Sequence, residues 1–214
     1  MARKKRIWYP GATYHIMSRG NRRNAIFKDE SDYVAFLEYL RMVKEAFSFK
    51  LHSLCLMTNH FHMCVETYDK ELWKIMHKLL LVYSTNYNIK YKLTGHLFEN
   101  RYTAQLIEDE GYFLEVSRYI HLNPVKAQMV RNPLDYEYSS YRLFVDLPGL
   151  EGEKKRSIVS GILSELVKTD RVLGAFKHND REQYRKFVEG KISHAEQEIL
   201  IQKDMKEDDM WLPW

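Results

Sequence analysis

The spacing of apolar residues along the chain predicts alternating strands and helices. Residues 14–19 follow a Pro-Gly pair and end at Gly20-Asn21, a turn dipeptide, so we expect a strand there. From Asp29 onward, apolar residues recur at helical spacing as far as Val43, and Asp29 or Ser31 is placed to cap the helix. The chain therefore begins with a strand and a helix, joined by a basic loop.

Two short apolar runs at residues 49–56 and 60–66 have the separation of a β-hairpin. Side chains of a strand alternate between its two faces. One face of the second run carries Phe61, Met63 and Val65, and the other carries His60, His62, Cys64 and Glu66. The apolar face must pack on a core, which leaves the histidines on a face that another element covers.

The rest of the first 145 residues continues this alternation. Residues 70–91 carry an apolar stripe at helical spacing, Gly95 breaks that helix, and residues 104–107 form a short strand. Asp109 begins a third helix, which we expect to end before Pro124, because proline disfavours the helical conformation of the preceding residue. The resulting order is β-α-β-β-α-β-α.

This order contains the β-α-β-β-α-β pattern of a ferredoxin-like antiparallel sheet. We therefore predict an α+β fold in three parts: a basic N-terminal arm (1–9), a ferredoxin-like domain (10–149) and a helical C-terminal appendage (150–214). Within the appendage, apolar residues at helical spacing cover 158–176 and 181–192. The sequence assigns no role to this appendage.

Composition narrows the class of protein. The 214 residues are 45% hydrophobic and 29% charged, as in soluble globular proteins, and no apolar run approaches the ~18 residues of a membrane span. Cys55 and Cys64 do not form a Cys-x-x-Cys pair, which argues against a disulfide framework and a four-cysteine zinc site. We expect a cytoplasmic monomer or homodimer with no membrane partner.

Charge points to a nucleic-acid partner. The net charge is +4, yet residues 1–28 alone carry +8 and no acidic residue. Clustered cations attract polyanions by releasing their counterions, and interleaved aromatic residues favour unstacked bases. For the cluster at residues 3–6, a solvated tail is an equal alternative. The candidate DNA contacts are Arg3, Lys4, Lys5, Arg6, Arg19, Arg22, Arg23, Arg101 and Arg118.

Two pairs of side chains are candidates for chemistry. His60 and His62 project side by side from one strand face, which suits two metal ligands, although a solvent-facing pair would have the same spacing. Tyr119 and Asn123 lie one helical turn apart, ~6 Å along the axis. The alternative is a packed tyrosine and a C-terminal capping asparagine before Pro124.

Five ordered segments closely resemble the single-tyrosine HUH transposases, particularly the REP-associated tyrosine transposases. They are PGATYHIMSRGN (10–21), LMTNHFH (56–62), GHLFENRY (95–102), RYIHLNPVKA (118–127) and SSY (139–141). Together they extend over about 130 residues, and such an ordered set is far more specific than any single motif. Residues 150–214 resemble this family only loosely.

The resemblance implies a ferredoxin-like nuclease that cuts and rejoins single-stranded DNA through a 5′-phosphotyrosine, on hairpin or palindromic repeat DNA. His60 and His62 match the HUH pair that holds a divalent metal, Mg²⁺ or Mn²⁺. Tyr119 matches the nucleophile, and Asn123 stands where relatives place a third, polar ligand. We expect DNA transposition by cleavage and rejoining.

Two positions depart from the pattern, since Lys126 and Gln128 stand where relatives often carry Arg and Gly. Both are outside the chemistry that the resemblance implies. Two alternative functions stay open. One is a replication-initiator type HUH nuclease, against which the lack of a helicase-type phosphate loop argues; the other is a non-catalytic DNA- or RNA-binding regulator on the same fold.

Overall fold

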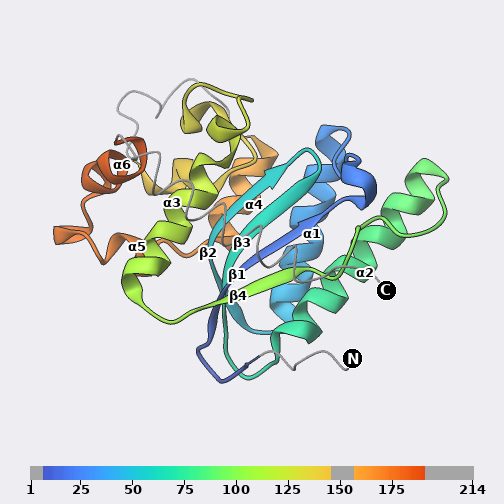
Figure 1. The fold of residues 1–214 in the computed structure, drawn as a ribbon, viewed down its shortest axis with the longest axis horizontal. Coiled ribbons are helices and arrows are strands. Elements are labelled where there is room, and N and C mark those ends of the chain that lie inside the picture. The colour runs from blue at the N-terminus through green and yellow to red at the C-terminus, as the bar shows by residue number, and fades with distance from the viewer. Residues whose placement is uncertain (1–6, 146–156, 191–214) are drawn as a thin grey trace.

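The computed structural model describes residues 7–145 and 157–190 (Figure 1). Four strands and three long helices form the main body: β1 (Thr13–Arg19), α1 (Glu30–Ala46), β2 (Phe49–Met57), β3 (His60–Thr67), α2 (Leu72–Tyr91), β4 (Thr103–Ile107) and α3 (Glu110–Lys126). The described C-terminal part adds α4 (Ile158–Leu166), α5 (Asp170–Leu173) and α6 (Arg181–Glu189). Short 3₁₀ turns are η1 (Asn21–Arg23), η2 (Pro133–Asp135), η3 (Ser140–Phe144) and η4 (Lys177–Asn179).

The strands form one sheet in the order β2-β3-β1-β4, with every pair antiparallel. This is the order of a ferredoxin-like β-α-β-β-α-β unit, so the predicted fold class is confirmed. The register of β1 with β3 sets His15 opposite Cys64, Met17 opposite His62, and Arg19 opposite His60. Residues opposite each other share a face, so His15 and His62 lie on the same side of the sheet.

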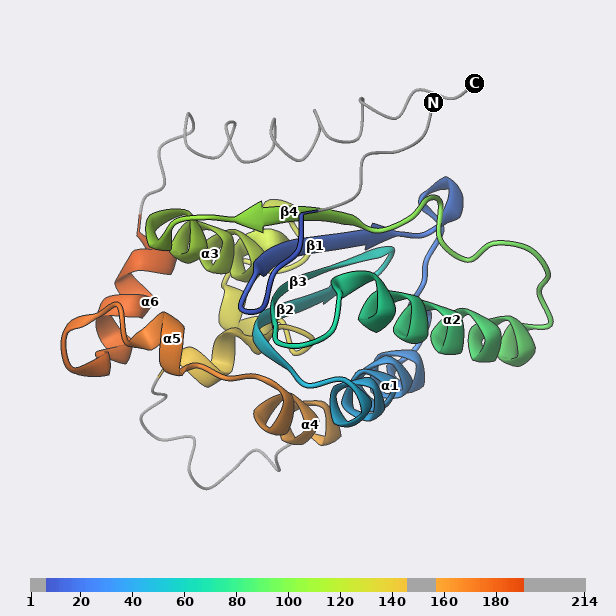
Figure 2. The ribbon, with the colours of Figure 1, turned by 90° about the horizontal axis from the view of Figure 1, so that it is seen from below.

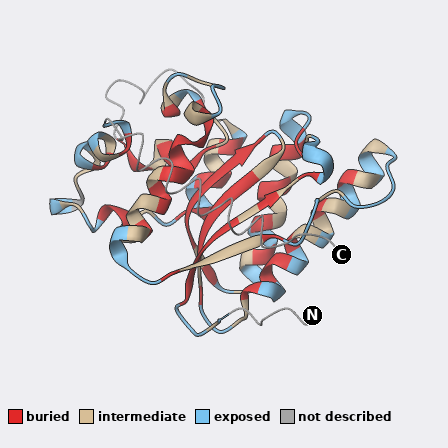
Figure 3. Ribbon diagram, in the orientation of Figure 1, coloured by how far each residue is buried: buried red, intermediate tan, exposed pale blue. Residues whose placement is uncertain are grey.

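Different helices cover the two faces (Figure 2). On one face α1 and α2 bury an aromatic core, in which the Phe36 ring lies 5.0 Å from that of Phe61 and 5.1 Å from that of Tyr83. On the other face α3 lies across β2 and β3. Buried residues are concentrated on the sheet and the inner faces of these helices (Figure 3). The alternation predicted for residues 60–66 therefore separates an apolar core from the face under α3.

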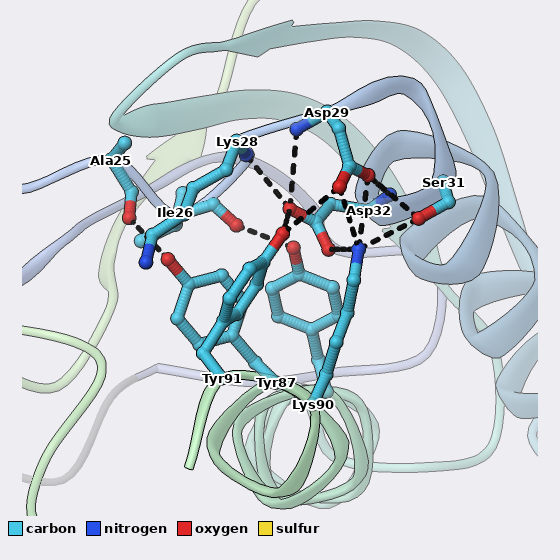
Figure 4. Close-up of polar contacts among 10 residues, drawn as sticks. Ala25, Ile26, Lys28, Asp29, Ser31, Asp32, Tyr87, Lys90 and Tyr91 are labelled. Carbon is cyan, nitrogen blue, oxygen red and sulfur yellow. Dashed lines mark hydrogen bonds and ion pairs between the residues drawn. The ribbon is translucent and has the colours of Figure 1, made fainter. Parts of the chain in front are cut away.

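A cluster of polar contacts joins the start of α1 to the end of α2 (Figure 4). Asp29 caps α1 by accepting from the Asp32 amide, and Lys90 of α2 reaches both carboxylates at 2.9 and 2.7 Å. Tyr91 donates to Asp32 at 2.8 Å. Hydrogen bonds from Ser31 and then Lys90 hold the pKa of Asp29 below its usual value. The cluster fixes the two helices against each other beneath the sheet.

The predicted end of the third helix is wrong, because α3 continues through Pro124 to Lys126. A proline inside a helix removes one backbone hydrogen bond, but the carbonyls of Asn123 and Pro124 still accept from Ala127 and Met129, both at 2.9 Å. Pro124 is buried, and this burial offsets the lost bond. Tyr119 and Asn123 therefore lie within a continuous helix rather than at its end.

The described C-terminal helices pack on the main body, and the prediction of helices in this region is confirmed for residues 157–190. The α4 helix lies beside α1, and α6 lies against α3. Residues 191 and 192 of the expected helix fall outside the described residues. Among the helices described, none has the length and apolar character that a membrane crossing requires.

Candidate active site

His60 and His62 stand at the start of β3, on the sheet face that α3 covers. His62 is only 3% exposed and His60 is half-buried. Burial, reinforced by the nearby Arg19 cation, lowers the pKa of His60 to about 4. Burial and then the neighbouring His60 lower the pKa of His62 well below its usual value. Both imidazoles are therefore neutral at pH 7, the state in which a ring nitrogen can bind a metal.

The hydrogen bonds of Asn59 determine which nitrogen of His60 is available. The Asn59 amide nitrogen donates to the Arg23 carbonyl at 3.0 Å, which turns its oxygen toward His60. Nδ1 of His60 donates to that oxygen at 2.6 Å. Because the proton is on Nδ1, the lone pair of His60 is on Nε2. Asn59 thereby leaves Nε2 of His60 available to a metal.

His15 of β1 makes the equivalent contact to His62. Nε2 of His15 lies 3.0 Å from Nδ1 of His62, and the two rings stack with centroids 5.2 Å apart. Either ring can donate in this hydrogen bond; when Nδ1 of His62 donates, Nε2 of His62 carries the lone pair that a metal can bind. In that tautomer both histidines of the pair have Nε2 available.

Tyr119 of α3 lies directly over the buried rings of His15 and His62. Its ring meets the His62 ring edge-on at 5.4 Å and the His15 ring at 5.6 Å, and Tyr119 is 9% exposed. One turn further on, the Asn123 side chain is 8% exposed and its amide nitrogen donates to the Tyr119 carbonyl at 2.9 Å. The oxygen of this amide is then the Asn123 atom able to coordinate a metal.

These side chains suit a divalent cation with open positions. Among the described residues, no three His, Cys, Asp or Glu side chains are grouped to hold a metal, and the Asn123 oxygen is the candidate for a third protein ligand. Two imidazoles and one amide form an intermediate ligand set, compatible with Mn²⁺ or Mg²⁺. Such a set leaves room for substrate oxygens.

Lys126 adds a positive charge on the same face of α3. Its ammonium lies 4.3 Å from the centroid of the Tyr119 ring. A cation over an aromatic ring is attracted to the face of the ring, and its positive charge also favours a nearby tyrosinate over the neutral tyrosine. Lys126 was expected to lie outside the chemistry, whereas in the structure its ammonium packs on the ring of the candidate nucleophile.

The site therefore combines a neutral histidine pair, a facing tyrosine and a nearby cation. A protein-family model described as "Transposase IS200 like" matches residues 9–123, which include both histidines, Tyr119 and Asn123. The chain belongs to the IS200-like transposase family. This is a family of HUH single-tyrosine nucleases that generally depend on a metal, so the predicted type of enzyme is confirmed.

One solved structure shows a similar fold. The IS200-like chain superimposes on a REP-associated tyrosine transposase bound to a REP hairpin, with a TM-score of 0.57 and 16% identity, over 67% of this chain and 84% of that one. A candidate transposase from Deinococcus radiodurans R1 gives a TM-score of 0.39 and 16% identity, over 56% and 95%. A search of curated proteins finds no significant match.

The predicted DNA contacts of this IS200-like transposase fall into three groups, and the first lies in η1 and the segments beside it. Arg22 and Arg23 are exposed in η1, where φ values of 54° and 58° put both in the left-handed region. Such strain persists only where surrounding contacts impose it, here through the Asn59–Arg23 bond. Arg19 pairs with Glu99 at 3.0 Å, and Arg101 is exposed in the loop before β4.

Arg118 forms the second group and the N-terminal arm the third. The Arg118 guanidinium lies 4.5 Å from the Phe187 ring centroid, pairs with Glu115 and is 11% exposed, so α6 occupies its surroundings. A DNA contact by Arg118 stays a prediction. Residues 3–6 of the N-terminal arm lie outside the described residues, so their contact with DNA stays a prediction.

His15 is a site residue that the sequence did not reveal. The usable signal was its alternation with Tyr14 and Ile16, but the register that brings it to His62 is tertiary. His121, two residues after Tyr119 in α3, has a structural role. Its ring bonds Tyr184 at 2.7 Å and Ser140 at 2.8 Å, which ties the far side of α3 to α6 and η3.

Proposed function

We propose that this protein cleaves and rejoins single-stranded DNA by transesterification at Tyr119, next to a divalent metal held by His60, His62 and Asn123. One observation carries the proposal: the Tyr119 ring lies 5.4 Å from the ring of His62, within one chain. A nucleophile and the ligands of a charge-neutralising cation must approach one phosphate together. Tyr119 therefore serves the histidines of its own chain.

The proposed reaction exchanges one bond of the phosphate for a bond to Tyr119. When bound, the metal neutralises charge on the non-bridging phosphate oxygens and orients the group for in-line attack. The Tyr119 oxygen forms a bond to phosphorus, the bond from phosphorus to the 3′ oxygen breaks, and a 3′ hydroxyl is released on taking up a proton. The phenolic proton passes to solvent or to a neighbouring base. A 3′ hydroxyl can later reverse the step, because the phosphotyrosine conserves the bond energy.

Lys126 lowers the cost of forming the tyrosinate. Deprotonating a tyrosine of ordinary pKa ~10 to tyrosinate at pH 7 costs about 4 kcal/mol. A cation near the ring offsets part of this cost. Lys126→Met is expected to slow adduct formation about 10- to 100-fold, while Lys126→Arg keeps most of the rate. Single-turnover kinetics with Lys168→Met, a change at an exposed lysine elsewhere, provide the control. Equal rates for Lys126→Met and wild type would contradict this role.

We infer a substrate of single-stranded DNA beside a hairpin. The solved relative of similar fold was bound to a REP hairpin, and the exposed Arg22 and Arg23 lie in a loop tied to His60 through Asn59. Stacked duplex DNA obstructs simultaneous access of a helix-borne tyrosine and a strand-borne metal to one phosphate. Unpaired DNA removes this obstruction.

The test uses a labelled DNA pool with random single-stranded flanks on a hairpin, incubated with Mn²⁺ and resolved under denaturing conditions. We expect a covalent protein–DNA adduct, absent without the metal, and weaker binding to a fully paired duplex at the same salt. Tight binding without any adduct would instead favour the non-catalytic regulator. Preference for the duplex would overturn the substrate assignment.

A further inference from the structure

A pocket of about 710 Å³ lies between α2 and the loop that leads from α2 to β4. Figure 2 shows this loop leaving the end of α2 and running back toward β4. Three of the α2 residues that line the pocket are exposed, including Trp73 and Leu81 at 52% each. The residues of the pocket used in the argument are Trp73, His77, Leu81, Phe98, Asn100 and Arg101.

The walls of the pocket are held in place by the fold. The Trp73 indole donates to Glu71 at 2.9 Å, so its ring is oriented although half of it faces solvent. Phe98 packs toward Phe61 of the core, with ring centroids 6.3 Å apart, and pairs with Gly20 through a β-bridge. The pocket is therefore formed before any ligand arrives, which reduces the entropy cost of binding.

The pocket loop lies beside the strand that neighbours the candidate active site, although α2 and the histidine pair are on opposite faces of the sheet. Arg19 lies opposite His60 in the sheet, and its carbonyl accepts from the Glu99 amide of the pocket loop at 2.9 Å. Two strand spacings therefore separate the loop from His60, about 10 Å.

A basic segment lies between the two sites. The Asn21 amide donates to the Leu97 carbonyl at 2.8 Å, so η1 borders the pocket loop. The exposed Arg22 and Arg23 of η1 also border His60, through Asn59. A DNA strand crossing the active site would meet these two cations before it reached the pocket. Their charge suits its phosphates, and the aromatic pocket suits a base.

From this geometry we infer that the pocket binds one unstacked base of the DNA strand that passes His60. The inference rests on the proposed function, since it takes the DNA to lie at that site. Trp73 provides a flat surface for stacking, Leu81 and Phe98 provide apolar contact, and Asn100 and Arg101 provide polar groups for the base edge or its phosphate. The pocket selects for a nucleotide a few positions from the scissile phosphate.

The experiment combines an abasic scan with a variant of the pocket. Oligonucleotides of one single-stranded sequence that the protein binds, each with a single abasic position, are tested for binding by fluorescence anisotropy with wild type and Trp73→Ala. Wild type is expected to lose about 5- to 100-fold in affinity at one position near the cleavage site. Trp73→Ala should bind the intact oligonucleotide more weakly than wild type by a similar factor. Its affinity should then be the same with and without the base at that position.

Ile89→Ala is the matched control, because Ile89 is 71% exposed on α2 and does not line the pocket. Leu81→Glu is a second variant, which adds a negative charge to the pocket and should weaken binding further. If Trp73→Ala and Leu81→Glu bind as Ile89→Ala does, the pocket inference is overturned. Adduct formation is measured separately, so its absence refutes the proposed chemistry while the abasic pattern still tests the pocket.

Discussion

Tyr119→Phe is expected to reduce covalent adduct formation by at least about 10³-fold, because the change removes only the attacking oxygen. The phenyl ring can keep its edge-on contacts with His15 and His62, so folding should be preserved. Metal-dependent binding of single-stranded DNA should also be unchanged. Denaturing gels measure the adduct, and anisotropy and thermal unfolding measure the other two properties.

Tyr112→Phe is the matched control for this prediction. Tyr112 lies seven residues before Tyr119 on the same helix and is only partly buried. It should form adducts at the wild-type rate. An adduct that persists in Tyr119→Phe and disappears in Tyr112→Phe would transfer the nucleophile to Tyr112 and refute the site as drawn.

His60→Gln is expected to lower Mn²⁺ affinity by at least about 10-fold and adduct formation by a larger factor. The loss follows from removing one of two imidazole ligands, whose lone pair the Asn59 contact presents. Because His60 is only half-buried, the folded state should be retained. Calorimetric titration with Mn²⁺ measures the affinity directly, independently of any DNA reaction.

His62→Ala should affect metal binding at least as strongly, but with a cost in stability. His62 is 3% exposed and hydrogen-bonded to His15, so its removal leaves a cavity and removes the contact with the His15 ring. We expect this change to lower the free energy of unfolding by about 1–3 kcal/mol. His178→Ala, at an exposed histidine in η4, should change neither property. Unaltered Mn²⁺ affinity in both His60→Gln and His62→Ala rules out this pair as the metal site.

Much of the site could be predicted because its pairs are local. Alternation along a strand puts His60 and His62 on one face, and helical spacing puts Tyr119 and Asn123 on one stripe, whatever lies around them. Asn59 was also visible, beside His60 in the hairpin turn, yet its role depends on where the Arg23 carbonyl is held. Lys126 follows Tyr119 by seven residues and was equally visible, but an expected helix end at Pro124 put it outside the helix.

The sequence by itself determined the order of elements, the two faces of β3 and the residue types that carry the chemistry, because backbone geometry and hydrophobic periodicity act over a few residues. Tertiary structure decided the rest. The register of β1 with β3 brought His15 to His62, and the burial of Pro124 allowed α3 to continue to Lys126. The docking of α3 on the sheet then placed Tyr119 over the histidines. These outcomes depend on packing between residues far apart in the chain, which no local pattern encodes.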